Sequence, residues 1–328
     1  MISFNYLKTV ARYEAKTLRR SWLFRLFSFG ALFILGIFNI GAFSPVGDQD
    51  WESLAIPATL PPLNLYMLNI AQALVIVFLA SDFLKRDKKL DTNEVLYTRP
   101  MSNFEYIIGK TAGILRLFLG LNIIILLYCL VINLTAKGTP VDILSYFSHL
   151  LIISVPTLIF SLGLAYILMT IIRNQAITFL LLLGFAALNM FYLWFRADSI
   201  FDYMLFGLPV FKSEIIGYDN LAMIIAQRVL YTSLGVAFIM ITILLFKRLP
   251  QSRPHAVLTV ILLVVSLVSA GYSGITYYNN FASGKRLKQV TLETNSRYEN
   301  EPFVTITGSR IELSHDGSSI SGNCDYGL

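Results

Sequence analysis

The stretch from Thr111 to Leu134 reads TAGILRLFLGLNIIILLYCLVINL. Its one charged residue is Arg116, which lies near the start of the run. A helix needs about 20 apolar residues to cross the roughly 30 Å hydrocarbon core of a bilayer. The run is long enough and apolar enough, so it predicts a membrane-spanning helix.

Other stretches of the chain have the same character. The seven predicted spans run from Trp22 to Phe43, Leu63 to Ser81, Thr111 to Leu134, Phe147 to Ile172, Ala176 to Phe195, Ala222 to Phe246 and Ala256 to Asn279. The composition agrees, because 55% of the 328 residues are hydrophobic and 14% are charged, against about 25% charged residues in soluble domains. We therefore expect an all-α polytopic membrane protein.

Basic residues in the connections indicate the orientation of the chain. The segments before the first span and between the second and third spans are rich in Lys and Arg, whereas residues 44–62 carry none. Because cytoplasmic connections carry an excess of Lys and Arg, this alternation places the amino terminus in the cytoplasm and the segment after Asn279 outside. The basic residues of that last segment do not oppose this, since long exported domains cross largely regardless of charge. The formal net charge of +6 follows from the same bias, so it does not indicate a nucleic-acid partner.

Residues 1–21 are predicted to form an amphipathic helix at the cytoplasmic membrane surface. Its basic residues recur at i, i+4, i+8 and i+11 and so form one stripe, which would anchor the helix to anionic headgroups. The stripe consists of Lys8, Arg12, Lys16 and Arg19. The alternative is that these residues continue the first span into the cytoplasm.

The connection from Asp82 to Lys110 carries the most informative local signals. Thr92 can cap a short helix that has Glu94 in its first turn. Ser102, with Glu105 three residues later, forms a capping-box pattern for the next helix. We expect a short charged helix, joined directly to two spans, on which a partner could push.

Motifs that carry catalytic chemistry are missing from the sequence. It has no phosphate-binding loop, HExxH pair, CxxC pair or Gly-x-Ser-x-Gly elbow. His149, His255 and His315 are scattered, whereas metal ligands occur at close spacing. Cys129 lies within an apolar run and Cys324 beyond the last span, so no intrachain disulfide is expected. We therefore expect a chain that is not an enzyme and holds no metal or cofactor itself.

Ionisable residues are also missing from the centres of the predicted spans. Asp82 and Arg116 lie near the inner face, and Arg228 lies near the outer face, where its side chain can snorkel. Ion-coupled carriers place such residues at mid-membrane. The sequence therefore disfavours an ion-coupled carrier, and the energy for any transport would come from a partner.

Residues 82–110 resemble the hallmark of type-2 ABC exporter permeases, in which a charged run, Thr-x-Glu-x-Leu, Thr-x-Pro-x-Ser and Gly-Lys link the second and third spans. The matching residues are Arg86, Asp87, Thr92, Glu94, Leu96, Thr98, Pro100, Ser102, Gly109 and Lys110. Residues 1–250 also resemble the family in the order of their elements. The family often has Gly-Thr where this chain has Asp91-Thr92, and the seventh span is an addition to its plan.

The resemblance implies a six-span permease domain at 22–250 and a seventh helix at 251–280, in a bacterial cytoplasmic (inner) membrane. A separate cytoplasmic ABC ATPase would bind ATP and Mg and dock on the coupling residues. These are Arg86, Asp87, Thr92, Glu94, Leu96, Thr98, Pro100 and Ser102. A second permease half, identical or paralogous, would complete the exporter. Lipids, glycans, peptides and drugs all remain open as substrates.

Residues 281–328 are expected to begin an extracytoplasmic β-rich domain that continues beyond the sequence, because short alternating runs flank the turn residues 316–319. Ile311, Leu313, Ile320 and Gly322 resemble the opening strands of the aminopeptidase N family. That family's zinc ligands would lie beyond residue 328. The alternative function is therefore a membrane anchor that presents an exported aminopeptidase-like or binding domain.

Two further features concern helix packing. In the permease family the outer segment, here Arg196–Leu221, forms short helices that dip back and cap the exit of the pathway. The alternative is an ordinary loop with interfacial aromatic residues. Gly109 and Gly113 form a Gly-x-x-x-Gly pair, which favours close helix packing.

Overall fold

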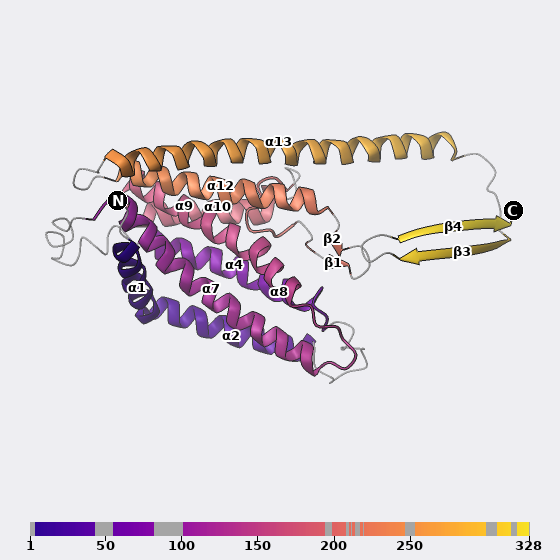
Figure 1. Ribbon diagram of the computed structural model, residues 1–328, viewed down its shortest axis with the longest axis horizontal. Helices are drawn as coiled ribbons and strands as arrows, with labels where there is room; N and C mark the ends of the chain where they lie inside the picture. Colours follow the sequence, from indigo (N-terminus) through magenta and orange to yellow (C-terminus); the bar gives the residue numbers. More distant parts are fainter. Residues whose placement is uncertain are drawn as a thin grey trace.

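The computed structural model is an elongated helical bundle (Figure 1). It describes residues 4–42, 55–81, 101–193, 199–207, 210, 212–213, 217–218, 220–246, 253–299, 307–315 and 320–327. The helices are α1 (Phe4–Arg20), α2 (Trp22–Ala42), α4 (Leu60–Ser81), α7 (Asn103–Thr135), α8 (Ile143–His149), η1 (Leu150–Ser154), α9 (Val155–Ile172), α10 (Gln175–Leu188), η2 (Asn189–Leu193), α12 (Leu221–Leu245) and α13 (Arg253–Arg297). The strands are β1 (Lys212–Ser213), β2 (Gly217–Tyr218), β3 (Gly308–His315) and β4 (Ile320–Gly327).

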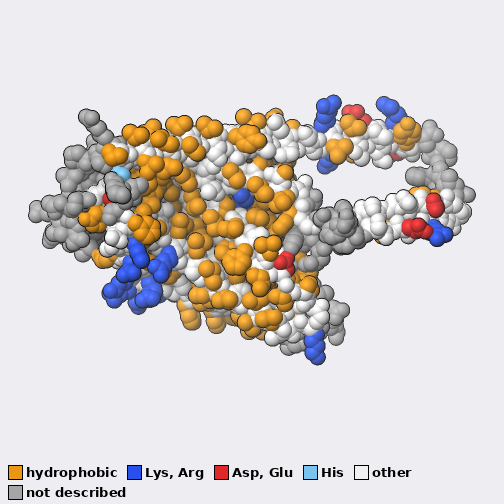
Figure 2. All heavy atoms as spheres, viewed as in Figure 1, with side chains coloured by type: hydrophobic (Ala, Val, Ile, Leu, Met, Phe, Trp, Pro, Cys, Tyr) orange, Lys and Arg blue, Asp and Glu red, His pale blue; other side chains and the backbone are white. Residues whose placement is uncertain are grey.

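Seven of the described helical segments are long and apolar enough to cross a membrane, which confirms the predicted number of spans. They are Trp22–Ala42, Leu60–Ala80, Asn103–Thr135, Ile143–Ile172, Gln175–Leu193, Leu221–Leu245 and Pro254–Arg297. Hydrophobic side chains cover the visible flank of the bundle, and charged side chains gather toward its two ends (Figure 2). The protein is therefore a multi-pass membrane protein.

The two ends of the bundle differ. At one end, here named the α1 end, α1 lies across the start of α7, and α12 finishes nearby (Figure 1). At the opposite end, here named the hairpin end, α13 projects past the other helices and the β3–β4 hairpin lies beyond the bundle (Figure 1).

The amino-terminal helix is separate from the first span. Ser21 interrupts the helix between α1 and α2, and its hydroxyl accepts a hydrogen bond from the Phe24 backbone N–H at 3.2 Å. Such a cap satisfies one of the free amides at a helix start. The break at Ser21 therefore separates the helix Phe4–Arg20 from the first span.

Two spans contain π-helical turns. The fourth span passes from α8 through η1 into α9, and the fifth passes from α10 into η2. A π turn rotates the residues that follow it and often occurs at functional sites. Here the turns bring Ser154 of η1 and Asn189 of η2 into buried positions.

The last span differs from its predicted length. The β-rich segment was expected from residue 281, but α13 continues as one helix to Arg297. Residues 282–299 are exposed, and local contacts support the extension, such as the bond from the Ser283 hydroxyl to the Asn279 carbonyl and the Lys285 ammonium 4.7 Å from the Phe281 ring centre. The dipeptide Ser283-Gly284 is a turn signal in the sequence, yet the helix continues through it.

The predicted β structure is present as a hairpin, but in this region the described β structure is limited to two strands. β3 and β4 pair antiparallel, with Ile311 opposite Cys324 and Leu313 opposite Gly322. The described side chains of the hairpin are exposed. The expected turn, residues 316–319, lies outside the described residues.

Candidate functional site

Most of the predicted coupling residues cannot be placed. Residues 82–100 lie outside the described part of the chain, and they include all of the predicted coupling residues except Ser102. The candidate site therefore consists of the helix ends on either side of this connection. They are the end of α4 at Ser81 and the start of α7 at Asn103.

The start of α7 has the predicted capping box. The Ser102 backbone N–H donates to the Glu105 carboxylate at 3.0 Å, and the Glu105 N–H donates to the Ser102 hydroxyl at 3.1 Å. The Asn103 side-chain amide also donates to the Phe246 carbonyl at 2.9 Å. The first residues of α7 are thus fixed both by their own cap and by the end of α12, a contact that no local pattern in the sequence indicates.

Helix α1 packs on α7 through the Gly-x-x-x-Gly pair. A Cβ atom on Gly109 would lie 2.7 Å from the Val10 Cβ, and one on Gly113 would lie 2.7 Å from the Ala11 carbonyl oxygen. Real Cβ atoms do not approach other atoms this closely, so only glycine allows this helix separation. The packing prediction is confirmed, and the partner helix is α1.

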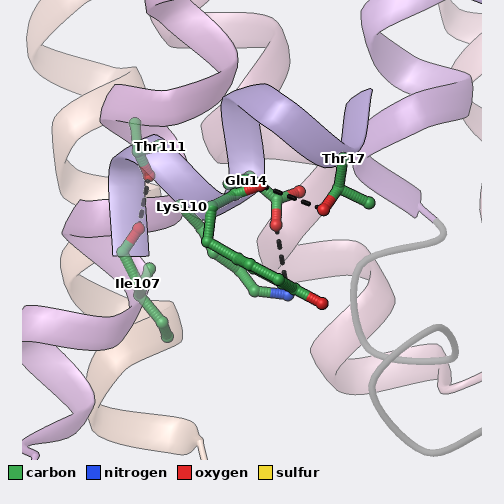
Figure 3. Close-up of polar contacts among 6 residues, drawn as sticks. Glu14, Thr17, Ile107, Lys110 and Thr111 are labelled. Carbon is green, nitrogen blue, oxygen red and sulfur yellow. Dashed lines mark hydrogen bonds and ion pairs between the residues drawn. The ribbon is translucent and has the colours of Figure 1, made fainter. Parts of the chain in front are cut away.

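A buried ion pair reinforces this contact (Figure 3). The Lys110 ammonium lies 3.9 Å from the Glu14 carboxylate, and both side chains are almost fully buried. The ammonium also lies 5.0 Å from the centre of the Tyr106 ring. Removing one member would leave the other charge buried without this partner, which is costly in apolar surroundings. Lys110 matched the family pattern, but Glu14 was not singled out from the sequence, although it lies among the apolar residues of α1.

The predicted anchoring residues lie on the opposite side of α1. Lys8, Arg12, Lys16 and Arg19 are exposed, whereas Glu14 and Leu18 are buried. Lys and Arg side chains form a compact patch at the α1 end of the molecule (Figure 2). The structure brings the four predicted residues together on one surface.

A second polar centre lies toward the hairpin end. Residues 199–207 contain no helix, yet Asp202, Tyr203, Met204 and Leu205 are buried. Their carbonyl groups accept hydrogen bonds from several helices, including those from the Asn69 amide to Met204 at 2.7 Å and from the Thr157 hydroxyl to Tyr203 at 2.8 Å. Residues 199–207 thus form an irregular segment whose middle part is buried among the helices.

Arg228 of α12 is central to this arrangement, and the expectation that it snorkels is wrong. Its side chain is buried, and the guanidinium donates to the Asp202 carbonyl at 2.8 Å and to the Tyr203 carbonyl at 3.2 Å. Irregular backbone within a membrane protein needs such donors, because lipid supplies none.

A chain of uncharged polar residues continues from this centre between the spans. The Asn69 amide oxygen accepts from Gln72 at 3.0 Å, and the Gln72 oxygen accepts from Asn122 at 2.8 Å. The Ser154 hydroxyl then donates to the Asn122 oxygen at 2.6 Å. All four residues are buried, so α4, α7 and η1 are joined by hydrogen bonds near the middle of their spans. None of these side chains is ionisable, so the charged residues of the sequence give no sign of this network.

Among the described residues, no group of three or more His, Cys, Asp and Glu side chains could hold a metal ion. No protein-family model matches the chain, and no curated protein matches its sequence.

Proposed function

We propose that this protein is the transmembrane subunit of an ATP-driven ABC exporter, in which a separate ATPase docks on the connection between α4 and α7. The α1 end would then face the cytoplasm of a bacterial cell, and the hairpin end would lie outside the inner membrane. ATP and Mg would be bound by the ATPase, and a second permease half would complete the working unit.

The proposal rests mainly on the contacts that join the start of α7 to α1 and to α12. It is tied to α1 by the Glu14–Lys110 pair and the two glycine contacts, and to α12 by the bond from Asn103 to Phe246. A push on the connection that precedes Ser102 would therefore move α1, α7 and α12 together. This is the mechanical arrangement that a subunit driven by an external motor requires.

The resemblance of residues 82–110 supplies the identity of the motor. Its charged residues, and Glu94 above all, would pair with a groove on the ATPase. The buried amide network between the spans supports the proposal in a second way, because it contains no ionisable side chain that would couple transport to protons.

The proposal is tested by purifying the tagged chain in mild detergent and identifying the proteins that accompany it by mass spectrometry. We expect an ATPase subunit, and we expect Glu94→Lys to abolish its recovery. Glu293→Lys, on the exposed extension of α13, makes the same charge change and should leave recovery intact. An ATPase that is absent, or that is lost equally with both variants, would contradict the proposal.

A second candidate is a membrane anchor that presents an exported domain. It is favoured by α13, whose 45 residues form a continuous helix leading toward the hairpin. At about 1.5 Å per residue the helix is more than twice as long as a typical bilayer core is thick. This role predicts that an activity outside the membrane survives Glu94→Lys, and it is compatible with transport.

A further inference from the structure

Helix α1 has one face that contacts α7 and an opposite face that is exposed and basic. Val10, Ala11 and Glu14 contact α7 at Gly109, Lys110 and Gly113. Because successive residues are separated by about 100° around a helix, Lys16 lies about 160° from Glu14. The apolar side of the helix is therefore occupied by protein, and the basic stripe points away from α7.

The position of α1 along α7 places this stripe near a membrane surface. The 33 residues of α7 form a helix about 50 Å long, which exceeds the hydrocarbon core by about 20 Å. The contacts with α1 fall in the first third of α7, at Gly109 and Gly113. In addition, α1 is joined through Ser21 directly to Trp22, where the first span begins. Both relationships put α1 at the level of the lipid headgroups.

The charges on the outward face are not compensated within the part of the chain that the structure describes. Lys8, Arg12, Lys16 and Arg19 are exposed, and none forms an ion pair with a described residue. The acidic residue of this helix, Glu14, faces Lys110 instead. A surface with four aligned cations at headgroup level is complementary to anionic phospholipid.

We propose that the basic face of α1 binds the headgroups of anionic phospholipids, and that this binding stabilises the contact between α1 and the start of α7. The signal from lipid to α7 would pass through the glycine contacts and the Glu14–Lys110 pair. The further consequence, that anionic lipid regulates the docking of an ATPase next to Ser102, rests on the proposed function. The lipid binding itself does not.

The test uses the full chain in nanodiscs of phosphatidylcholine alone or with added phosphatidylglycerol, and it needs no ATPase. Hydrogen–deuterium exchange is measured for α1 and for residues 103–115. We expect phosphatidylglycerol to slow exchange in both segments. Replacing Lys8, Arg12, Lys16 and Arg19 together by Gln should remove the slowing, with a fall in affinity for anionic bilayers of about fivefold for each cation lost.

Two further variants distinguish the binding of lipid to α1 from the effect of that binding on the start of α7. Glu14→Gln keeps the basic stripe, so α1 should still be protected by phosphatidylglycerol, whereas residues 103–115 should lose that protection. Replacing Lys285, Arg286 and Lys288 by Gln removes cations from the exposed extension of α13 and should change neither segment.

A further experiment uses the unchanged chain, so its result does not depend on whether the fourfold variant folds. Raising the salt to about 1 M shortens the screening length to about 3 Å and should cancel the effect of phosphatidylglycerol on the unchanged chain. Hydrogen–deuterium exchange that is equal with and without phosphatidylglycerol would overturn the proposal. So would slowing by phosphatidylglycerol that persists both in the fourfold variant and at high salt. If instead the fourfold variant loses a co-purifying ATPase while exchange never responds to lipid, the stripe binds protein and the lipid assignment is wrong.

Discussion

Gly235 of α12 lies so close to Phe160 of α9 that a Cβ atom on Gly235 would sit 2.7 Å from the Phe160 Cα. Gly163, one turn further along α9, meets the backbone of Gly235 in the same way. The Phe160 ring packs beside this crossing against Tyr231, with the two ring centres 4.9 Å apart. The two helices therefore touch backbone to backbone at this crossing.

The first prediction concerns this crossing. Gly235→Ala should lower the melting temperature of the detergent-purified protein, because overpacking a close contact costs about 1–3 kcal/mol. Gly184→Ala is the matched control, since a Cβ atom on Gly184 in α10 would meet no other atom within 4 Å. It should leave the melting temperature unchanged or raise it slightly, as Ala favours helix over Gly by about 1 kcal/mol. Equal effects of the two substitutions would refute the close crossing.

The second prediction concerns the contact between α1 and α7. Gly109→Leu should displace α1, because its side chain would occupy the position of Val10. A Cβ atom on Gly120, on the same helix, would meet no other atom within 4 Å, so Gly120→Leu should have little effect. The measurement is the proteolysis rate of α1 in detergent, which should rise for the first variant alone. Unchanged proteolysis in Gly109→Leu would contradict the packing of α1 on this glycine.

The third prediction concerns Arg228. Arg228→Met removes the hydrogen bonds from the guanidinium to the Asp202 and Tyr203 carbonyls, and a hydrogen bond to a charged group contributes about 1.5–3 kcal/mol. We expect a lower melting temperature and faster labelling of a cysteine placed at Met204, measured with a water-soluble maleimide in a Cys324→Ser background. Arg116→Met alters an exposed arginine and serves as the control. Labelling at 204 that is no faster in Arg228→Met than in the control would show that Arg228 does not hold this segment.

The fourth prediction concerns the amide network. Asn122→Ala and Ser154→Ala each break the 2.6 Å bond between these residues, so their effects on stability should not add. A double-mutant cycle should give a coupling energy of about 0.6–2 kcal/mol, the range for hydrogen bonds between membrane helices. Additive effects would mean that the two side chains do not interact in the folded protein.

Local and compositional features were predictable from the sequence. The apolar runs gave the number of spans, since the length of a span is set by the thickness of the bilayer. Ser102 and Glu105 predicted a helix start because a capping box involves residues only three positions apart. The spacing of Lys8, Arg12 and Lys16 likewise predicted one exposed stripe.

Long-range contacts were not predictable in this way. Nothing in the local pattern indicates that Glu14 meets Lys110, or that Arg228 turns toward the Asp202 carbonyl instead of the membrane surface. Asn122 looked unremarkable within an apolar run, and its role depends on a π turn that directs Ser154 toward it. The end of α13 was missed because the polar residues after Asn279 and the turn signal Ser283-Gly284 favour a loop locally, whereas the helix continues through them.

The most direct test of the central claim is photo-crosslinking in cells. A photoreactive amino acid is placed at Leu96, in the connection between α4 and α7, and at Leu292, on the exposed extension of α13. If an ATPase docks on this connection, Leu96 crosslinks to an ATPase subunit, identified by mass spectrometry of the adduct, and Leu292 does not. If Leu96 gives no ATPase adduct in cells where the protein is correctly inserted, the connection is not a docking site and the exporter assignment is wrong.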